Sequence, residues 1–304
     1  MHAALPFPVT PQAARALPLK LRRGMPAEQA FESILANCLT QIDANHQAVA
    51  HSDDVESLHQ MRVGLRRLRA ALAMFADYLV LPPALSDELS WLVGELGPAR
   101  DWDVMLEVTL PALPLSPDVG TLARAGAQQM HARAGAAVAS PRYGQWMAAM
   151  QAWRDRRGWR DMLSAARQAS LQARVDEIAA TILTKAHKRM VRRGRKLKQG
   201  GPAERHRLRI AAKRTRYASE FFASLFARRR VRPYVAALAR LQDELGALND
   251  ADVASRLLTE LPGNDGTLAA DVHFARGYLY LRAEHAVPQV RRRWKKLRAM
   301  ARPH

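Results

Sequence analysis

The chain has 304 residues, of which 48% are hydrophobic and only 6% aromatic, and its 47 Lys and Arg against 28 Asp and Glu give a formal net charge of +19. This length suffices for two domains or for one duplicated domain. The abundance of Ala, Leu and Arg favours an all-α fold, because these residues lose least on entering a helix. The charge indicates a polyanionic partner such as nucleic acid, polyphosphate or an anionic membrane surface. It is also uneven, since residues 1–150 carry 12 − 14 = −2 and residues 151–304 carry 35 − 14 = +21.

Some classes of protein are excluded at this stage. Cys38 is the only cysteine, so an internal disulfide and a cysteine-based metal centre are ruled out. Its position in an apolar segment predicts a buried free thiol. No apolar run approaches the roughly 18 residues of a membrane span, and the first residues lack the pattern of a signal peptide. We therefore expect a soluble cytoplasmic protein.

The leader, residues 1–24, is rich in proline and is expected to be irregular. Beyond it, apolar periodicity interrupted by Gly, Pro and acidic turns predicts helices throughout and no strands. In the first half we expect helices at 26–50, 55–81, from about 86 to Gly97-Pro98, and at 102–110, 118–139 and 142–155. In the second half we expect helices at 168–198, 203–227, 231–245, 251–261 and 267–299, the last broken at Pro288.

Two motifs occur twice. The basic segment LHQMRVGLRRLRAALAMF (58–75) matches RHRLRIAAKRTRYASEFF (205–222) at a shift of 206 − 59 = 147. Downstream, ELGPARDWDV (95–104) matches ELGALNDADV (244–253) at a shift of 244 − 95 = 149. Two ordered motifs at nearly constant spacing indicate an internal duplication. We expect two similar helical bundles, at about 26–155 and 165–299, related by a pseudo-twofold axis.

The basic residues of each motif helix share one face. At about 100° per residue, they fall within a stripe about 80° wide that apolar residues border on both sides. We call these sets the first and second basic stripes; they comprise His59, Arg62, Arg66 and Arg69, and His206, Arg209, Lys213 and Arg216. A stripe bordered by core is expected to face a groove, between or along the two bundles. The alternative is an ordinary solvated helix face.

Arginine suits phosphate because its planar guanidinium forms bidentate hydrogen bonds and stays charged. His59 and His206 are expected to be neutral donors, or to become protonated beside a bound phosphate. Alternatively, each histidine caps or packs at its helix start. The densest basic segment is 185–198. It is either a solvated helix face or an extension of the groove through Arg189 and Arg193.

Each second motif carries a pair of aspartates. Asp101 and Asp103, like Asp250 and Asp252, follow an expected helix end, so we predict that they cap the next helix or pair with stripe arginines. A metal site or an acid/base pair is the alternative. The sequence contains no phosphate-binding loop, dinucleotide motif, nucleophile elbow or zinc-protease motif. We therefore expect no catalytic residue, no cofactor and no metal.

The combination H-x-x-R-x-x-x-[RK]-R-x-R with a downstream L-G-x-x-[RN]-D-x-D-V, twice in one chain, resembles the CHAD domain, the conserved histidine α-helical domain, over about residues 26–299. This resemblance implies two helical bundles that bind inorganic polyphosphate along a basic groove, often at polyphosphate granules. It implies that the eight residues of the two stripes are the phosphate ligands. Secondary candidates are Arg67 and Arg214, which point off the stripes, and Arg189 and Arg193. The E-x-E-x-K signature of the CYTH domain does not precede residue 26, so we expect the stand-alone form.

Three functions remain open from the sequence. Non-enzymatic polyphosphate binding is the leading prediction. A nucleic-acid-binding protein would need aromatic or base-reading residues among the cations, and only Tyr217 borders a stripe. A metal-dependent polyphosphate-processing enzyme would need carboxylates beside the groove, for which the aspartate pairs are the only candidates.

Overall fold

The computed structural model describes residues 12–198, 201–261 and 266–302. These residues form helices and no strand, with one isolated bridge between Pro26 and Arg174. The predicted all-α fold is therefore confirmed. No helix within these three segments is long and apolar enough to cross a membrane.

The helices follow one another closely along the chain. The first half contains α1 (Ala27–Asp43), α2 (His46–His51), α3 (Val55–Met74), α4 (Pro83–Val104), η1 (Met105–Thr109), η2 (Leu110–Ala112), α5 (Pro117–Ala139) and α6 (Pro141–Asp155). The remainder contains η3 (Arg160–Met162), α7 (Ala165–Gln172), α8 (Val175–Arg195), η4 (Lys196–Lys198), α9 (Pro202–Phe221), η5 (Ala223–Leu225), α10 (Arg228–Thr259) and α11 (Gly266–Arg298).

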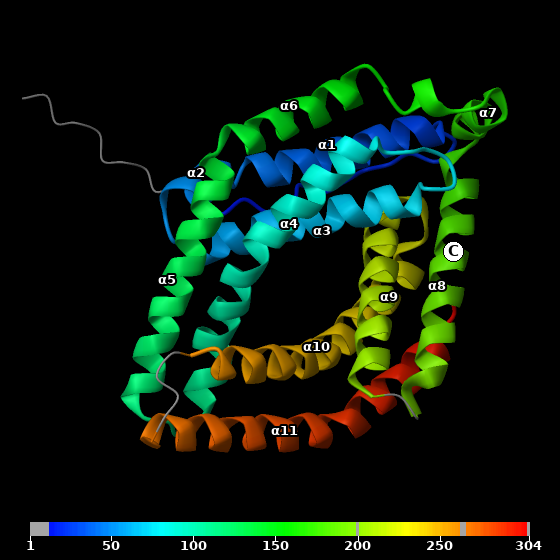
Figure 1. The fold of residues 1–304 in the computed structure, drawn as a ribbon. Coiled ribbons are helices and arrows are strands. Elements are labelled where there is room, and N and C mark those ends of the chain that lie inside the picture. Colours follow the sequence, from blue (N-terminus) through cyan, green and yellow to red (C-terminus); the bar gives the residue numbers. More distant parts are fainter. Residues whose placement is uncertain (1–11, 199–200, 262–265, 303–304) are drawn as a thin grey trace, which may run out of the picture.

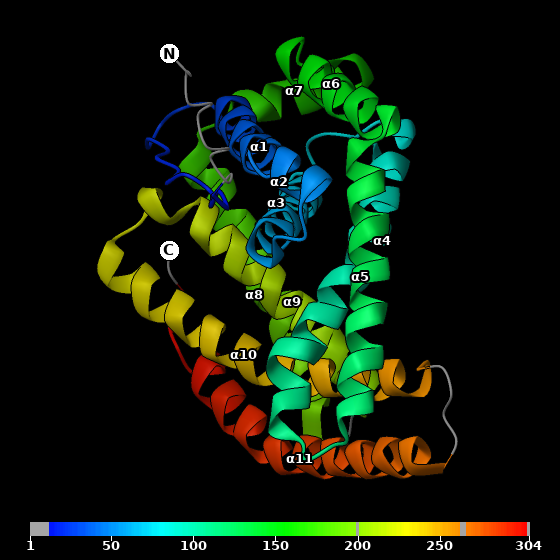
Figure 2. The ribbon, with the colours of Figure 1, turned by 90° about the vertical axis from the view of Figure 1, so that its left-hand side faces the viewer.

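The helices are arranged as the sides of a frame (Figure 1). Helices α1, α3 and α6 form one side, α5 with the later part of α4 the second, α10 with α11 the third, and α8 with α9 the fourth. The close pairs are α1 with α3, α4 with α5, α8 with α9, and α10 with α11. The view from the side shows α11 running along the outside of α10 and bending partway along its length (Figure 2).

Three hydrophobic clusters hold the described helices together. The largest joins α1, α3, α6 and the start of α8 to the end of α9, and contains the buried thiol of Cys38 as predicted. In it the rings of Phe75 and Phe222, equivalent positions of the two basic motifs, lie 6.3 Å apart. Contact between equivalent residues is what a pseudo-twofold axis would produce. The duplication and the two-repeat division stay predictions.

Several predicted helix ends are wrong. Helix α4 continues through Gly97-Pro98, α10 spans the predicted gap at 246–250, and α11 continues through Pro288. A proline inside a helix removes one hydrogen bond and bends the axis, but these long helices are packed against neighbours along much of their length, and tertiary packing supplies most helix stability. Figure 1 shows α4 bending along its course.

Two predicted single helices are instead divided. The segment 26–50 is interrupted at Asn45, whose side chain bonds to both backbone groups of Ala14 at 2.9 Å. The segment 168–198 is interrupted at Ala173, whose carbonyl accepts a hydrogen bond from the amide of Ala27 at 2.9 Å. Both interruptions are fixed by partners far away in the sequence, which helical periodicity does not report.

The described part of the leader has no helix, as predicted, but it is anchored to the domain. Besides the Asn45 contacts, the Asn37 amide donates to the carbonyl of Leu17 at 3.0 Å. The Ser224 hydroxyl bonds to both backbone groups of Leu21 at 2.9 Å. Residues 12–24 are therefore held along α1 and η5, and the expectation for residues 1–11 lies outside the described chain.

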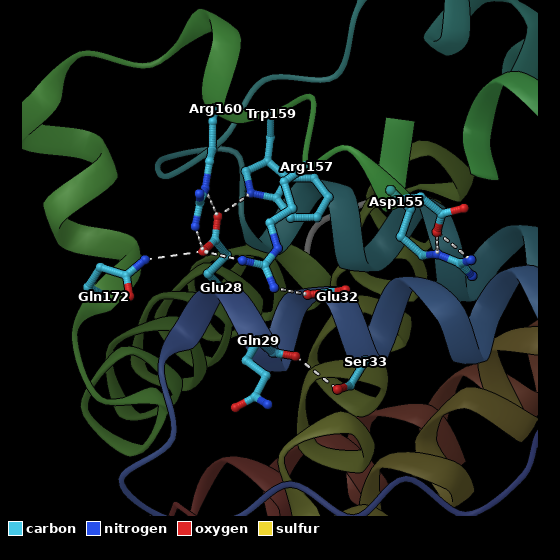
Figure 3. A network of polar contacts seen from close by, with 10 residues as sticks. Glu28, Gln29, Glu32, Ser33, Asp155, Arg157, Trp159, Arg160 and Gln172 are labelled. Atoms are coloured by element: carbon cyan, nitrogen blue, oxygen red, sulfur yellow. Dashed lines mark hydrogen bonds and ion pairs between the residues drawn. The ribbon is translucent and has the colours of Figure 1, made fainter. Parts of the chain in front are cut away.

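A buried carboxylate at the start of α1 connects this helix to η3 and α7 (Figure 3). Glu28 is only 4% exposed; it accepts hydrogen bonds from Arg160 Nε at 2.7 Å, Trp159 Nε1 at 2.8 Å and Gln172 Nε2 at 3.1 Å. The Arg160 guanidinium holds the pKa of Glu28 at about 2 in spite of its burial. This network ties the start of α1 to η3 and to the end of α7.

Candidate functional site

One large cavity, of about 1180 Å³, lies between α3, α4, α9, α10 and α11, with leader residues 15–19 at its edge. Both motif helices line it, so the two basic stripes share one cavity. Its basic lining residues are Arg15, His59, Arg62, Arg66, Arg67, Arg100, Arg209, Lys213, Arg216 and Arg282. Its carboxylates are Asp101, Glu220, Asp243 and Asp250.

Most of the predicted stripe residues line this cavity. They are His59, Arg62, Arg66, Arg209, Lys213 and Arg216. The exceptions are Arg69 and His206, which are exposed and lie outside the lining. Of the secondary candidates, Arg67 lines the cavity, Arg189 and Arg214 line a smaller one, and Arg193 lines neither. A role in binding stays a prediction for all of them.

Four half-buried cations of the cavity have no ion-pair partner among the described residues. Arg62, Arg66, Arg209 and Lys213 are half-buried, and none forms an ion pair with a described carboxylate. The Nε atoms of the three arginines are buried and find no hydrogen-bond acceptor within the described chain. Buried polar groups are normally satisfied in folded proteins. We call this set of four residues the central cations.

Two neighbouring arginines of the cavity, by contrast, have hydrogen-bond partners within the protein. The Arg67 guanidinium donates to Gln41 Oε1 at 2.8 Å and to Asn37 Oδ1 at 2.6 Å. Arg216 Nε donates to Glu220 Oε1 at 2.7 Å. The off-stripe residue Arg67 is thus bonded to α1 and lines the large cavity, whereas its counterpart Arg214 does not line it.

The central cations act on one another across the α3–α9 contact. Burial, followed by the charges of Arg209 and Arg66, lowers the pKa of Lys213 to about 7. Burial, followed by Arg66, lowers the pKa of Arg62 to about 10. The pKa of His59 is also lowered, by burial and then by Arg100 and Arg66. The charged forms of these three groups are therefore destabilised, and a bound anion would stabilise them.

Two aspartates offset part of this charge. Asp101 and Asp250 occupy equivalent motif positions and both line the cavity. Asp101 raises the pKa of Arg62, and Asp250 raises that of Arg209, against the larger effect of burial. Both lie inside continuous helices, so the prediction that they are N-caps is wrong. Neither forms an ion pair with a stripe arginine, which was the other half of that prediction; they act on Arg62 and Arg209 through charge at longer range.

The second aspartate of each pair differs between the motifs. Asp103 is buried inside α4, where it contacts His131 and lies 3.6 Å from Arg100. Asp252 is exposed and lines a different cavity beside the start of α9. Neither is an N-cap. No group of three or more His, Cys, Asp and Glu residues that could hold a metal ion occurs among the residues described.

The sequence reasoning missed some cavity residues. Arg100 stands at the variable [RN] position of the second motif, and its counterpart Asn249 lines the same cavity; the shared motif position was a signal for both. Arg282 comes from α11, outside both motifs, and carried no such signal. The motif glycine Gly97 lies beside the site, since a Cβ there would be in ordinary contact, at 3.4 Å, with Nη1 of Arg62.

These observations define the class of the protein. It is an all-helical domain in which two basic helices, remote in sequence, share one cation-lined cavity. Residues 33–259 match the CHAD domain model, and the chain belongs to the CHAD domain family. The crystal structure of the CHAD domain from the plant Ricinus communis is similar at 38% sequence identity, with a TM-score of 0.86, over 96% of this chain and 99% of that one.

A more distant structure supports the fold alone. PptA from Streptomyces chartreusis aligns at 18% identity with a TM-score of 0.65, over 90% of this chain and 99% of that chain. No curated protein sequence matches the chain significantly.

Proposed function

We propose that this protein binds inorganic polyphosphate in the large cavity and does not cleave it. The observation that carries the proposal is the set of central cations, which are half-buried, come from two helices and have no described ion-pair partner. A linear polyphosphate presents a negative charge at every unit, so one chain satisfies several such cations in succession. The CHAD family resemblance, which implies this ligand, supports the assignment.

Nucleic acid is a poorer fit to the same site. Among the described residues, two large aromatic side chains line the cavity, Tyr217 and Phe221. Single-stranded nucleic acid is usually held by a longer series of stacking rings. The basic faces of α3 and α9 look into the cavity while their other faces pack on neighbouring helices. Neither helix is free to enter a major groove.

The carboxylates of the cavity have a role that needs no catalytic step. Asp101 and Asp250 lie among cations that repel one another, and each favours the charged form of an arginine of its own half. We propose that they stabilise the empty site by offsetting part of its positive charge. The site as a whole still keeps a net positive charge. We further propose a cytoplasmic location at polyphosphate granules.

The ligand is tested by titrating the protein with long-chain polyphosphate, single-stranded RNA and duplex DNA at matched phosphate concentration and salt. Charge alone would bind all three with steep salt dependence. We expect polyphosphate to bind at least about tenfold more tightly, one unit of log K or about 1.4 kcal/mol. Equal affinities for the three polymers would contradict the assignment.

The site is tested with Arg62→Glu combined with Arg66→Glu. Binding should weaken strongly while the far-UV circular dichroism stays helical, because neither side chain belongs to the core. The matched control is Arg292→Glu with Arg298→Glu, two exposed residues of α11 that line no described cavity. Release of phosphate from polyphosphate in the presence of Mg²⁺, lost in Asp101→Asn, would instead favour the enzyme.

A further inference from the structure

A second, smaller cavity of about 200 Å³ lies where the end of α3 meets α8 and α9. Figure 1 shows α8 and α9 side by side at this place, with the end of α3 close to them. Its apolar lining is contributed by all three helices and consists of Ala70, Ala73, Met74, Ile182, Ala186 and Ala211. Its polar lining is Asp77, Tyr78, Lys185, Arg189 and Arg214.

This cavity is separate from the large one. The two share no lining residue, and they lie against different faces of α9: Arg209, Lys213 and Arg216 face the large cavity, while Ala211 and Arg214 face the small one. The small cavity therefore collects residues that the basic pattern singled out but the large cavity does not use.

Three arginines gather at the small cavity. Arg189 and Arg214 line it, and Arg69 of α3 is close enough that it and Arg189 lower the pKa of Arg214, after the larger effect of burial. All three are exposed to solvent, and none forms an ion pair with a described carboxylate. The one carboxylate of the lining, Asp77, is already 2.7 Å from Nζ of Lys185. The positive charge at this cavity is thus left uncompensated.

The combination of an apolar floor and a cationic rim defines the ligand chemistry. We propose that the small cavity binds a small organic phosphate, with its phosphate on Arg69, Arg189 and Arg214 and its apolar body against Ala73, Met74 and Ile182. Inorganic phosphate and polyphosphate carry no apolar part to place on that floor. The size agrees, since a cavity of about 150 Å³ accepts a benzene ring. This inference does not depend on the function proposed for the large cavity.

The test uses phenyl phosphate as the probe and inorganic phosphate as the charge-only comparison, with binding measured by ligand-observed saturation-transfer NMR and calorimetry. Burial of the ring should make phenyl phosphate bind at least about tenfold more tightly. Arg189→Ala with Arg214→Ala should remove most of this binding. Ala73→Leu, which fills the cavity from an exposed position, should weaken phenyl phosphate and leave inorganic phosphate unchanged.

Two controls separate this site from the others. Lys188→Ala removes an exposed cation of α8 that does not line the cavity, and it should leave binding of phenyl phosphate unchanged. Arg62→Glu with Arg66→Glu disables the large cavity, and phenyl phosphate should still bind. Equal affinity for phenyl phosphate and inorganic phosphate, or full binding in the Arg189/Arg214 double variant, would overturn the proposal whatever the large cavity binds.

Discussion

Nε2 of His131 on α5 lies 2.7 Å from Oδ1 of Asp103 inside α4. Asp103 is 3% exposed and its other oxygen is 3.6 Å from Nη1 of Arg100, which lines the large cavity. The hydrogen bond that His131 donates to Asp103 raises the pKa of His131. Helix α5 therefore takes part in the site without reaching it, because His131 fixes the carboxylate that lies beside Arg100.

The His131–Asp103 contact predicts a pH-dependent stability. A histidine whose pKa is raised by folding stabilises the protein fully below its unfolded pKa, near 6.5, and this contribution is lost as the pH rises through the folded pKa. His131→Gln should therefore lower the free energy of unfolding most at about pH 5.5, and less at pH 8.5. Urea denaturation across this range measures it, with exposed His285→Gln as the control. A loss that is the same at every pH would contradict the ion pair.

The lowered pKa of Lys213 predicts that the affinity for polyphosphate depends on pH. This pKa is about 7 in the empty cavity, and a bound polyanion would raise it, so binding should take up protons between about pH 7 and 9. The facing charged groups are Arg62, Arg66, Arg209 and Asp250. Affinity for polyphosphate should fall as the pH rises from 6.5 to 8.5.

Calorimetry in buffers of different ionisation enthalpy measures the proton uptake. Lys213→Arg should abolish it in this range, because arginine stays charged, while binding itself is retained. The comparison variant is His59→Gln, since the pKa of His59 is also lowered in the empty cavity and a bound anion would raise it; this variant should keep the uptake that belongs to Lys213. Undiminished uptake in Lys213→Arg would place the titrating group elsewhere.

The shared cavity predicts a steep dependence on chain length. A long polyphosphate contacts both stripes at once, and its second contact is made at high effective concentration. Removing either half, through Arg62→Ala with Arg66→Ala or through Arg209→Ala with Lys213→Ala, should abolish most of the advantage of long chains over triphosphate. Calorimetry with both lengths decides this. Losses that simply add, with no effect of length, would indicate two independent sites.

Glu28 predicts a large local contribution to stability. Its depressed pKa means that the network stabilises the fold above the unfolded pKa of 4.5 and loses this effect as the pH falls toward 2. Glu28→Gln should cost about 2–3 kcal/mol at pH 7, since it removes a charge that accepts several hydrogen bonds in a buried site. The control is Glu32→Gln, whose pair with Arg157 is more exposed and should matter little. Urea denaturation at pH 7 and pH 3 compares them.

The sequence by itself determined the all-α class and identified the half-buried cations that line the large cavity. Arg62, Arg66, Arg209 and Lys213 were placed on two stripes by helical periodicity, which depends only on how side chains are spaced along their own helix. The repetition of the motif indicated that the two stripes would be used together. Local spacing and internal comparison are both readable from one chain.

Tertiary structure alone decided the rest. Helix α4 continues through Pro98 because packing on α3 and α5 outweighs the loss of one hydrogen bond, so Asp101 lies in a helix interior rather than at a start. Arg69 and Arg216 occupy equivalent places in the sequence, yet only Arg216 lines the large cavity. The contacts of Asp103 with His131, and of Arg67 with Asn37, join residues 28 and 30 positions apart. Periodicity sets the direction of a side chain on its helix, but what that side chain meets is set by the other helices.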